Sequence, residues 1–223
     1  MSSKRLTKEE LRHDEFVETT AKVTAYLQNN FMTVLVAILG ALILIVLGVF
    51  FVKSQERTAV QADQAFFRVT GHYASGSYSE VLNEAQTVLD RYGDRREGKW
   101  TLYYAAAAHL ALAENDRAVE RFDEYLARDA GGEYDMAARL GKAIAYESRG
   151  DLELSAQTYG EVRAMTEAST AQHVQAAIGE TRALQQLGRI DEAIAVLEPM
   201  LMDSDPQVRQ EIESRLETLK ALR

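Results

Sequence analysis

The chain has 223 residues, no cysteine, two prolines and a formal net charge of −9. This length accommodates one ordinary domain plus a further segment, and the abundance of Ala, Leu, Glu and Arg favours helices over strands. The lack of cysteine excludes disulfides, thiolate metal sites and a lipidated N-terminal cysteine, and the acidic balance argues against nucleic acid, whose binding needs a basic surface.

Residues 1–30 form a polar segment in which five basic residues balance five acidic ones, so the charge deficit lies in the rest of the chain. Within it, Phe16, Val23 and Leu27 recur at helical spacing, which predicts a helix up to about Gln28. Such a helix either docks to another membrane protein or lies solvated beside the membrane, and the sequence leaves both alternatives open.

The segment from Phe31 to Val52 contains 22 residues without a charge. At ~1.5 Å per residue a helix of this length reaches roughly 33 Å, enough to cross a bilayer core of ~30 Å. A cleaved signal peptide has a shorter core of about 7–15 residues and a small-residue cleavage site close behind it. Here the core ends on the bulky Phe50, Phe51 and Val52. We therefore expect a permanent transmembrane helix.

The orientation of this helix is not fixed by charge. Residues 11–30 carry two basic residues and residues 53–72 carry three, whereas the whole N-terminal segment carries five. Because the positive-inside rule compares these two sides, it gives no clear answer here.

The join between the membrane helix and the following domain lacks any loop signal. Between Val49 and Thr70 there is neither Gly nor Pro, nor a cluster of Ser, Asn and Asp. We therefore expect one unbroken helix that continues to about Tyr73 and holds the following domain at a fixed height above the membrane.

One sequence pattern recurs through the rest of the chain. The stretch LGRIDEAIAVLEPM surrounds Gly188, and related stretches surround Gly76, follow Ala113 and surround Gly150. The residues five positions past these turns are spaced 37, 37 and 38 apart, and they are Val81, Ala118, Ser155 and Ala193. Nine positions past the turns stand Ala85, Phe122, Tyr159 and Leu197. A register held over this distance indicates an internal repeat.

Each copy is predicted to be a pair of amphipathic helices joined by a short turn. The expected first helices are 58–74, 98–112, 134–148 and 170–186, and the expected second helices are 78–91, 116–128, 152–165 and 190–202. The repeats accordingly span about 58–92, 98–129, 134–166 and 170–203, within a domain of residues 53–223. One helix pair cannot bury its apolar face alone, so the pairs must stack into an all-α solenoid.

A last helix is expected over residues 206–221. Pro206 occupies a tolerated first-turn position, and an apolar stripe is formed by Val208, Ile212, Leu216 and Leu219. Polar residues cover the other sides, which is typical of a helix that caps the end of a solenoid.

These copies resemble tetratricopeptide repeats in their small residue, Gly turn, Ala and aromatic residue. They are longer than the usual repeat because their connecting loops are longer. Together with the N-terminal segment and the single anchor, the chain resembles the single-pass ancillary subunit of the bacterial Sec translocon. That resemblance implies an inner-membrane protein with a cytoplasmic N-terminus, whose repeat domain faces the periplasm beside a membrane-anchored prolyl isomerase.

No constellation of catalytic or metal-ligating residues is found in the sequence. The four His residues are scattered, HExxH and CxxC are absent, and His109 is expected in a core or groove. The stretch GHYASGS lacks the Lys of a phosphate-binding loop. We therefore expect no enzymatic activity, no cofactor, no metal and no small-molecule substrate.

The tetratricopeptide resemblance implies that the first helix of each pair lines a concave face. The apolar members of this face, carried over by position, are Phe66, Tyr73, Trp100, Tyr103, Leu110, Leu140, Ile144 and Ile178. Aromatic clusters in exposed apolar grooves are typical of protein-binding hot spots. The alternative is that Trp100 and Tyr103 pack as core between the first two repeats, and the sequence does not decide between the two.

These features predict a membrane-anchored protein-protein interaction scaffold, a chaperone-like helper for translocated proteins at the Sec translocon. The expected partners are the translocon, the prolyl isomerase or unfolded client segments. One alternative is a cell-envelope assembly factor for cytochromes or outer-membrane proteins, and another is a recruiting platform that faces the cytosol. The sequence names neither the partner nor the oligomeric state.

Overall fold

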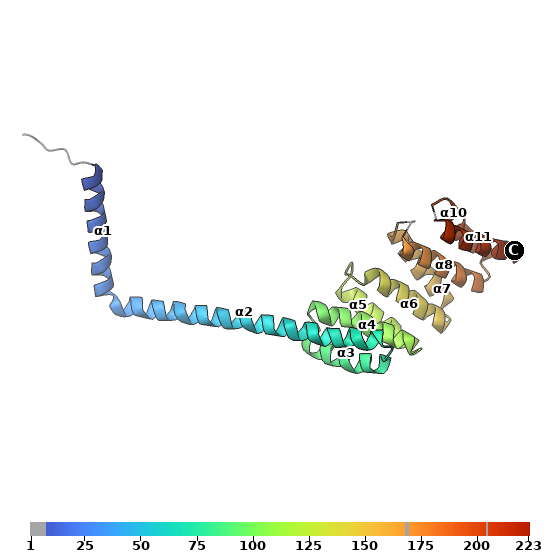
Figure 1. The fold of residues 1–223 in the computed structure, drawn as a ribbon, viewed down its shortest axis with the longest axis horizontal. Helices are drawn as coiled ribbons and strands as arrows, with labels where there is room; N and C mark the ends of the chain where they lie inside the picture. The colour runs from blue at the N-terminus through green and yellow to red at the C-terminus, as the bar shows by residue number, and fades with distance from the viewer. Residues whose placement is uncertain (1–7, 168–169, 204) are drawn as a thin grey trace, which may run out of the picture. The chain divides into compact units, whose positions relative to one another are not determined.

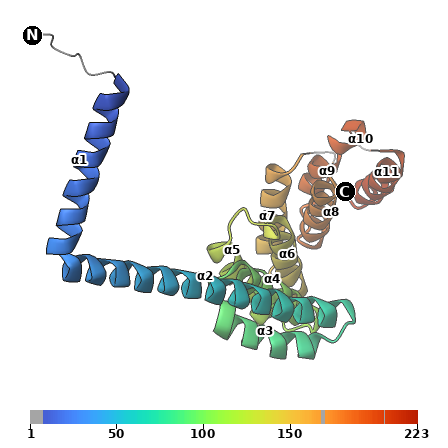
Figure 2. The same cartoon turned by 60° about the vertical axis from the view of Figure 1, so that its left-hand side comes forward.

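The computed structural model describes residues 8–167, 170–203 and 205–223. Every regular element within these ranges is a helix, and the helices are labelled in Figures 1 and 2. The chain divides into two compact units, Met1–Ala59 and Val60–Arg223.

The first unit contains α1 and the whole apolar segment from Phe31 to Val52. Helix α1 covers Lys8–Asn29, and α2 begins at Phe31 and continues to Ala74. The backbone N–H of Asn30 donates to the carbonyl of Tyr26 at 2.9 Å, so the junction is a tight turn rather than an open loop. Helix α1 agrees with the predicted N-terminal helix.

Helix α2 is long and apolar enough to cross a membrane by its length and composition. It is the one such helix among the described residues, and none of its most apolar window is buried by protein. A helix that is apolar on all sides and uncovered by protein is suited to a lipid surrounding. Its 44 residues run without interruption past the apolar segment, so the predicted continuity of the helix to about Tyr73 is confirmed.

In the second unit, the helices follow one another as stacked antiparallel pairs (Figure 2). After the C-terminal part of α2 come α3 (Tyr78–Tyr92), α4 (Arg96–Ala111), α5 (Asn115–Arg128), α6 (Asp135–Arg149), α7 (Leu152–Met165), α8 (Ala171–Gln186) and α9 (Ile190–Leu197). Each second helix packs against the first helix of the next pair, as α3 does against α4 and α7 against α8. The predicted all-α solenoid is confirmed.

One helix differs from its prediction. The expected helix over 190–202 is divided into α9, which ends at Leu197, and the short α10 (Met200–Asp203). Pro199 lies between them, and proline has no backbone N–H and clashes with the preceding helical turn. The predicted single helix over 190–202 was wrong because it included this proline as an interior helical residue.

The four turns inside the pairs share one geometry. The turn residue has a positive φ of 75° at Gly76, 58° at Ala113, 90° at Gly150 and 73° at Gly188. In all four, the backbone N–H of the residue after the turn residue donates to the carbonyl oxygen five residues earlier, at 2.9 Å. This hydrogen bond satisfies a carbonyl group at the end of the first helix, as in a Schellman motif. The second turn adopts this left-handed conformation with an alanine in place of glycine, so its backbone is strained at Ala113.

Consecutive pairs interlock through an aromatic ring and a glycine. A Cβ on Gly141 would lie 2.3 Å from the Phe122 ring, and one on Gly179 would lie 2.4 Å from the Tyr159 ring. Both aromatic residues are only 1% exposed. The two helices can approach this closely only because the glycines carry no side chain.

The last helix, α11 (Pro206–Ala221), closes the array. The Asp205 carboxylate accepts the backbone N–H groups of Gln207 at 2.9 Å and Val208 at 3.1 Å, which caps the helix start. Its stripe of Ile212, Leu216 and Leu219 is buried in the same apolar cluster as α9. The predicted capping helix is confirmed.

The turn geometry yields a prediction about backbone strain. Ala113→Gly should raise the free energy of unfolding by about 1 kcal/mol, because a left-handed backbone penalises any Cβ. Gly150→Ala should lower it by about 1 kcal/mol for the same reason, since no atom lies within 4 Å of the added Cβ to cause a clash. Denaturant unfolding of the two variants measures both changes, and equal signs would contradict the assignment.

Candidate protein-binding groove

Two adjoining cavities open on the side formed by the first helices of the pairs. Helix α4 contacts α6, and α6 contacts α8, so these helices form one continuous face. The first cavity has a volume of about 370 Å³. It is lined by Tyr73, Tyr103, Ala107, Leu110, Ala111, Phe122, Ala137, Leu140, Gly141, Ile144 and Gln175.

The second cavity lies further along the array and has a volume of about 470 Å³. It shares Ile144 and Gln175 with the first and is otherwise lined by Tyr159, Ala171, Val174, Ile178, Arg182, Asp205 and Val208. Because two lining residues are common to both, we treat the cavities as one continuous feature, the first-helix groove.

The structure brings most of the sequence candidates to this groove. Those that line it are Tyr73, Tyr103, Leu110, Leu140, Ile144 and Ile178. Leu140 is only 5% exposed and forms part of the wall, whereas the others are half-buried. Phe66 and Trp100 line neither cavity and belong to the neighbouring aromatic cluster.

That aromatic cluster joins the first three repeats. The Trp100 ring lies 5.6 Å from Phe66 and 5.7 Å from Tyr134, measured between ring centroids, and the Arg96 guanidinium lies 4.6 Å above it. The Tyr103 ring stacks on Tyr134 at 4.6 Å with an interplanar angle of 9°. Trp100 is therefore held between packed neighbours, whereas Tyr103 belongs both to this cluster and to the groove.

Sequence reasoning missed several lining residues because they come from outside the first helices. Phe122 and Tyr159 belong to second helices, and they reach the groove beside glycines that have no side chain to cover them. The signal was available, since Gly141 stands nine residues before its turn glycine while Phe122 stands nine residues after the preceding turn. Val208 and Asp205 come from the capping helix and its N-terminus.

The groove carries few charged groups, and one is neutralised within the chain. Arg182 donates to both carboxylate oxygens of Glu147, and the Tyr159 hydroxyl donates to the same carboxylate at 3.3 Å. Burial, aided by neighbouring tyrosines, raises the pKa of Tyr73 and of Tyr103 above the ordinary tyrosine value. Their hydroxyls therefore stay protonated at neutral pH and can donate hydrogen bonds to a partner's carbonyl groups.

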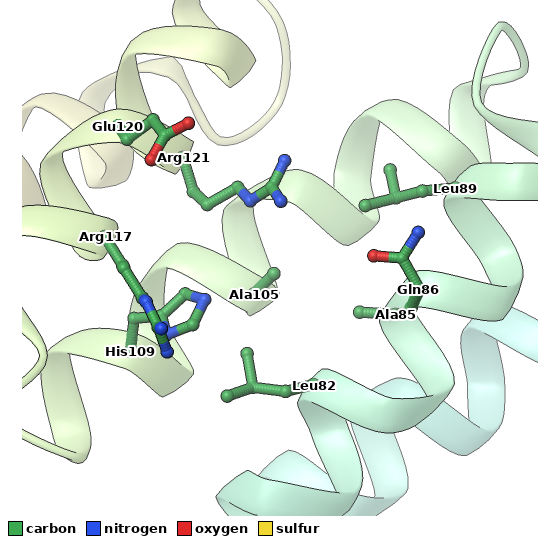
Figure 3. Close-up of a pocket in the computed structure, with 9 residues that line it drawn as sticks. All are labelled: Leu82, Ala85, Gln86, Leu89, Ala105, His109, Arg117, Glu120 and Arg121. Carbon is green, nitrogen blue, oxygen red and sulfur yellow. The ribbon is translucent and has the colours of Figure 1, made fainter.

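A separate cavity of about 320 Å³ opens between α3, α4 and α5, where His109 and Arg117 face Leu82 across the gap (Figure 3). Two of its polar groups are paired locally, since the Glu114 carboxylate contacts His109 Nδ1 at 2.7 Å and Arg117 Nη1 at 3.2 Å. These contacts lower the pKa of Glu114, with the hydrogen bond to His109 as the largest cause. No metal-ligating cluster is found among the described residues. His109 is 8% exposed and lies in the wall of this cavity, in agreement with the expected core or groove position.

Comparison with known proteins identifies the repeats. Residues 68–213 match the family model described as protein kinase G tetratricopeptide repeat. A solved structure from Podosopora anserina, described as having kinesin light chain nearly identical TPR-like repeats, is 17% identical with a TM-score of 0.56, covering 73% of this chain and 94% of that chain. A substituted form of the same protein is 16% identical with the same TM-score and coverage. These structures support the fold alone, and no curated protein matches the chain.

The position of the two aromatic residues generates a prediction. Trp100→Ala and Tyr103→Ala should each destabilise the domain by about 2–3 kcal/mol, because both rings are packed against buried neighbours. At temperatures where the variants stay folded, Tyr103→Ala should also weaken partner binding about 30-fold, whereas Trp100→Ala should not. Thermal unfolding and partner binding measure the two effects. Lost binding with unchanged stability in Trp100→Ala would contradict this assignment.

Proposed function

Because the chain belongs to the protein kinase G tetratricopeptide repeat family, we propose that it is a non-catalytic scaffold that holds segments of protein partners in the first-helix groove. The observation that carries the proposal is the groove itself, which extends across several repeats and is lined mainly by apolar side chains. Exposed apolar grooves of this kind mark protein-binding sites.

The chemistry of the groove supports apolar segments as its ligands. Leu110, Ile144 and Ile178 are half-buried and bury further area when a partner side chain covers them, each Å² contributing about 25 cal/mol. The tyrosine hydroxyls supply donors for backbone carbonyls, and Arg182 is already paired with Glu147. A segment that presents alternating apolar side chains, without a required charge, satisfies these groups.

The apolar helix α2 supports membrane anchoring as part of the same proposal. In this scheme the N-terminus is cytoplasmic, the repeats face the periplasm of a bacterial inner membrane, and unfolded segments leaving the Sec translocon are the clients. The architectural resemblance to the translocon's ancillary subunit supports this site of action, with a membrane-anchored prolyl isomerase as a neighbouring partner.

Groove variants test the binding function. The double substitution Ile144→Ser and Ile178→Ser should weaken binding of a chemically unfolded secretory protein at least about 10-fold, because both side chains line the groove. The matched control is Leu154→Ser on α7, which removes an exposed apolar side chain that lines neither groove cavity. Equal affinities of the double variant and the control, with both folded, would refute groove binding.

A reporter tests the orientation. An enzyme that is active only outside the cytosol, fused after Arg223, should be active in cells if the repeats face the periplasm. A silent but intact fusion would instead favour the recruiting platform that faces the cytosol. This measurement is independent of the groove variants, because it reports only on which side of the membrane the C-terminus lies.

A further inference from the structure

The C-terminal part of α2 presents an uncovered apolar stripe. One face of this part, with Ala62, Ala65 and Val69, is buried in the core of the first repeat. On the opposite face Phe67 is 76% exposed and Val60 is 55% exposed. The exposed residues that share this face at helical spacing are Val60, Gln64, Phe67, Gly71 and Ala74, which we call the outer stripe.

The register of the repeats explains what the outer stripe lacks. Phe67 stands nine residues before its turn glycine, the same position that Gly141 and Gly179 occupy in later repeats. In those repeats this position meets an aromatic ring from the second helix of the preceding pair. The compact unit begins at Val60, within the helix that carries Phe67, so it supplies no preceding pair to cover that position.

The outer stripe is complementary to itself. Phe67 projects from it, and Gly71, one helical turn further along, has no atom within 4 Å of the place where a Cβ would stand. An aromatic ring resting on a glycine is the contact that Phe122 makes with Gly141 inside this chain. One patch thus carries both the projecting ring and the gap that fits it, which a two-fold symmetric contact requires.

No charge on the outer stripe opposes such a contact. Among the flanking charges, Arg68 pairs with Glu84 at 3.0 Å and Asp63 pairs with Arg96 at 3.5 Å. These partners lie on α3 and α4 of the same chain, so Arg68 and Asp63 each have an ion-pair partner within it.

We propose that the outer stripe is the contact surface for a second copy of this chain, with the two α2 helices parallel and Phe67 of each copy packed on Gly71 of the other. The parallel arrangement follows from the proposed membrane anchoring, because both copies then enter the bilayer in the same direction. The stripe is short compared with interfaces that hold soluble dimers. Confinement of both copies in one membrane raises their effective concentration and compensates for this small area.

Cysteine crosslinking of the full chain in membranes tests the proposal. The chain contains no cysteine, so Gln64→Cys introduces a single thiol on the outer stripe. Two such thiols in a parallel pair lie close enough for a disulfide, which needs Cα atoms within about 7 Å. The matched control is Gln61→Cys, which also places the thiol at an exposed position. Val60 marks the angular centre of the outer stripe, and position 61 lies about 100° around the helix from it. We expect at least about 10-fold more disulfide-linked dimer from Gln64→Cys than from the control.

Further variants decide between the outcomes. Adding Phe67→Ser to Gln64→Cys should reduce the dimer at least about 10-fold without lowering the melting temperature, because Phe67 is exposed. Equal crosslinking of Gln64→Cys and Gln61→Cys in membrane-bound protein would overturn the proposal, as would a Gln64→Cys adduct with a different protein. Recovery of the chain outside the membrane fraction would overturn the parallel pair together with the anchor, while leaving the groove variants to test client binding separately.

Discussion

The architecture depends on the contact between a large side chain on one helix pair and a missing side chain on the next. Phe122 meets Gly141, and Tyr159 meets Gly179, at distances that leave no room for a Cβ. A helix pair in isolation would expose these rings to water, so each pair gains stability only when its neighbour is in place. The turns and the capping helix then serve this stacking by fixing where each ring points and by covering the last pair.

The same contact also shapes the first-helix groove. Because a glycine covers so little of the ring beneath it, Phe122 and Tyr159 contribute to the lining of the first-helix groove while remaining almost fully buried. The stacking of the pairs and the lining of the groove therefore share atoms in this protein. A change at either ring would alter the stacking and the groove together, which is why the groove is best probed through half-buried residues such as Ile144 and Ile178.

The sequence predicted the fold well because its signals were local and repeated. The turn glycines and the small residues five positions later mark each helix pair, and Val81, Ala118, Ser155 and Ala193 are all fully buried. The groove was predicted less completely. Helical spacing identifies the face of a residue, but whether a half-buried ring borders a cavity depends on the volumes of its neighbours. Trp100 and Tyr103 share one face, yet only Tyr103 borders the groove.

At the interface between the first and second helix pairs, the small and the large residue exchange places relative to the two later interfaces. At the equivalent positions it has Ala85 on the second helix and Tyr104 on the next first helix, where Tyr104 packs against the core around Val81 and Val88. The repeats are therefore not interchangeable modules. Deletion of the third helix pair would bring Phe122 opposite Gly179, which again places an aromatic ring against a glycine. Deletion of the second helix pair would bring Ala85 opposite Gly141 and leave a void the size of an aromatic ring. Deletion of the third pair would therefore keep a ring-on-glycine contact, whereas deletion of the second pair would lose one.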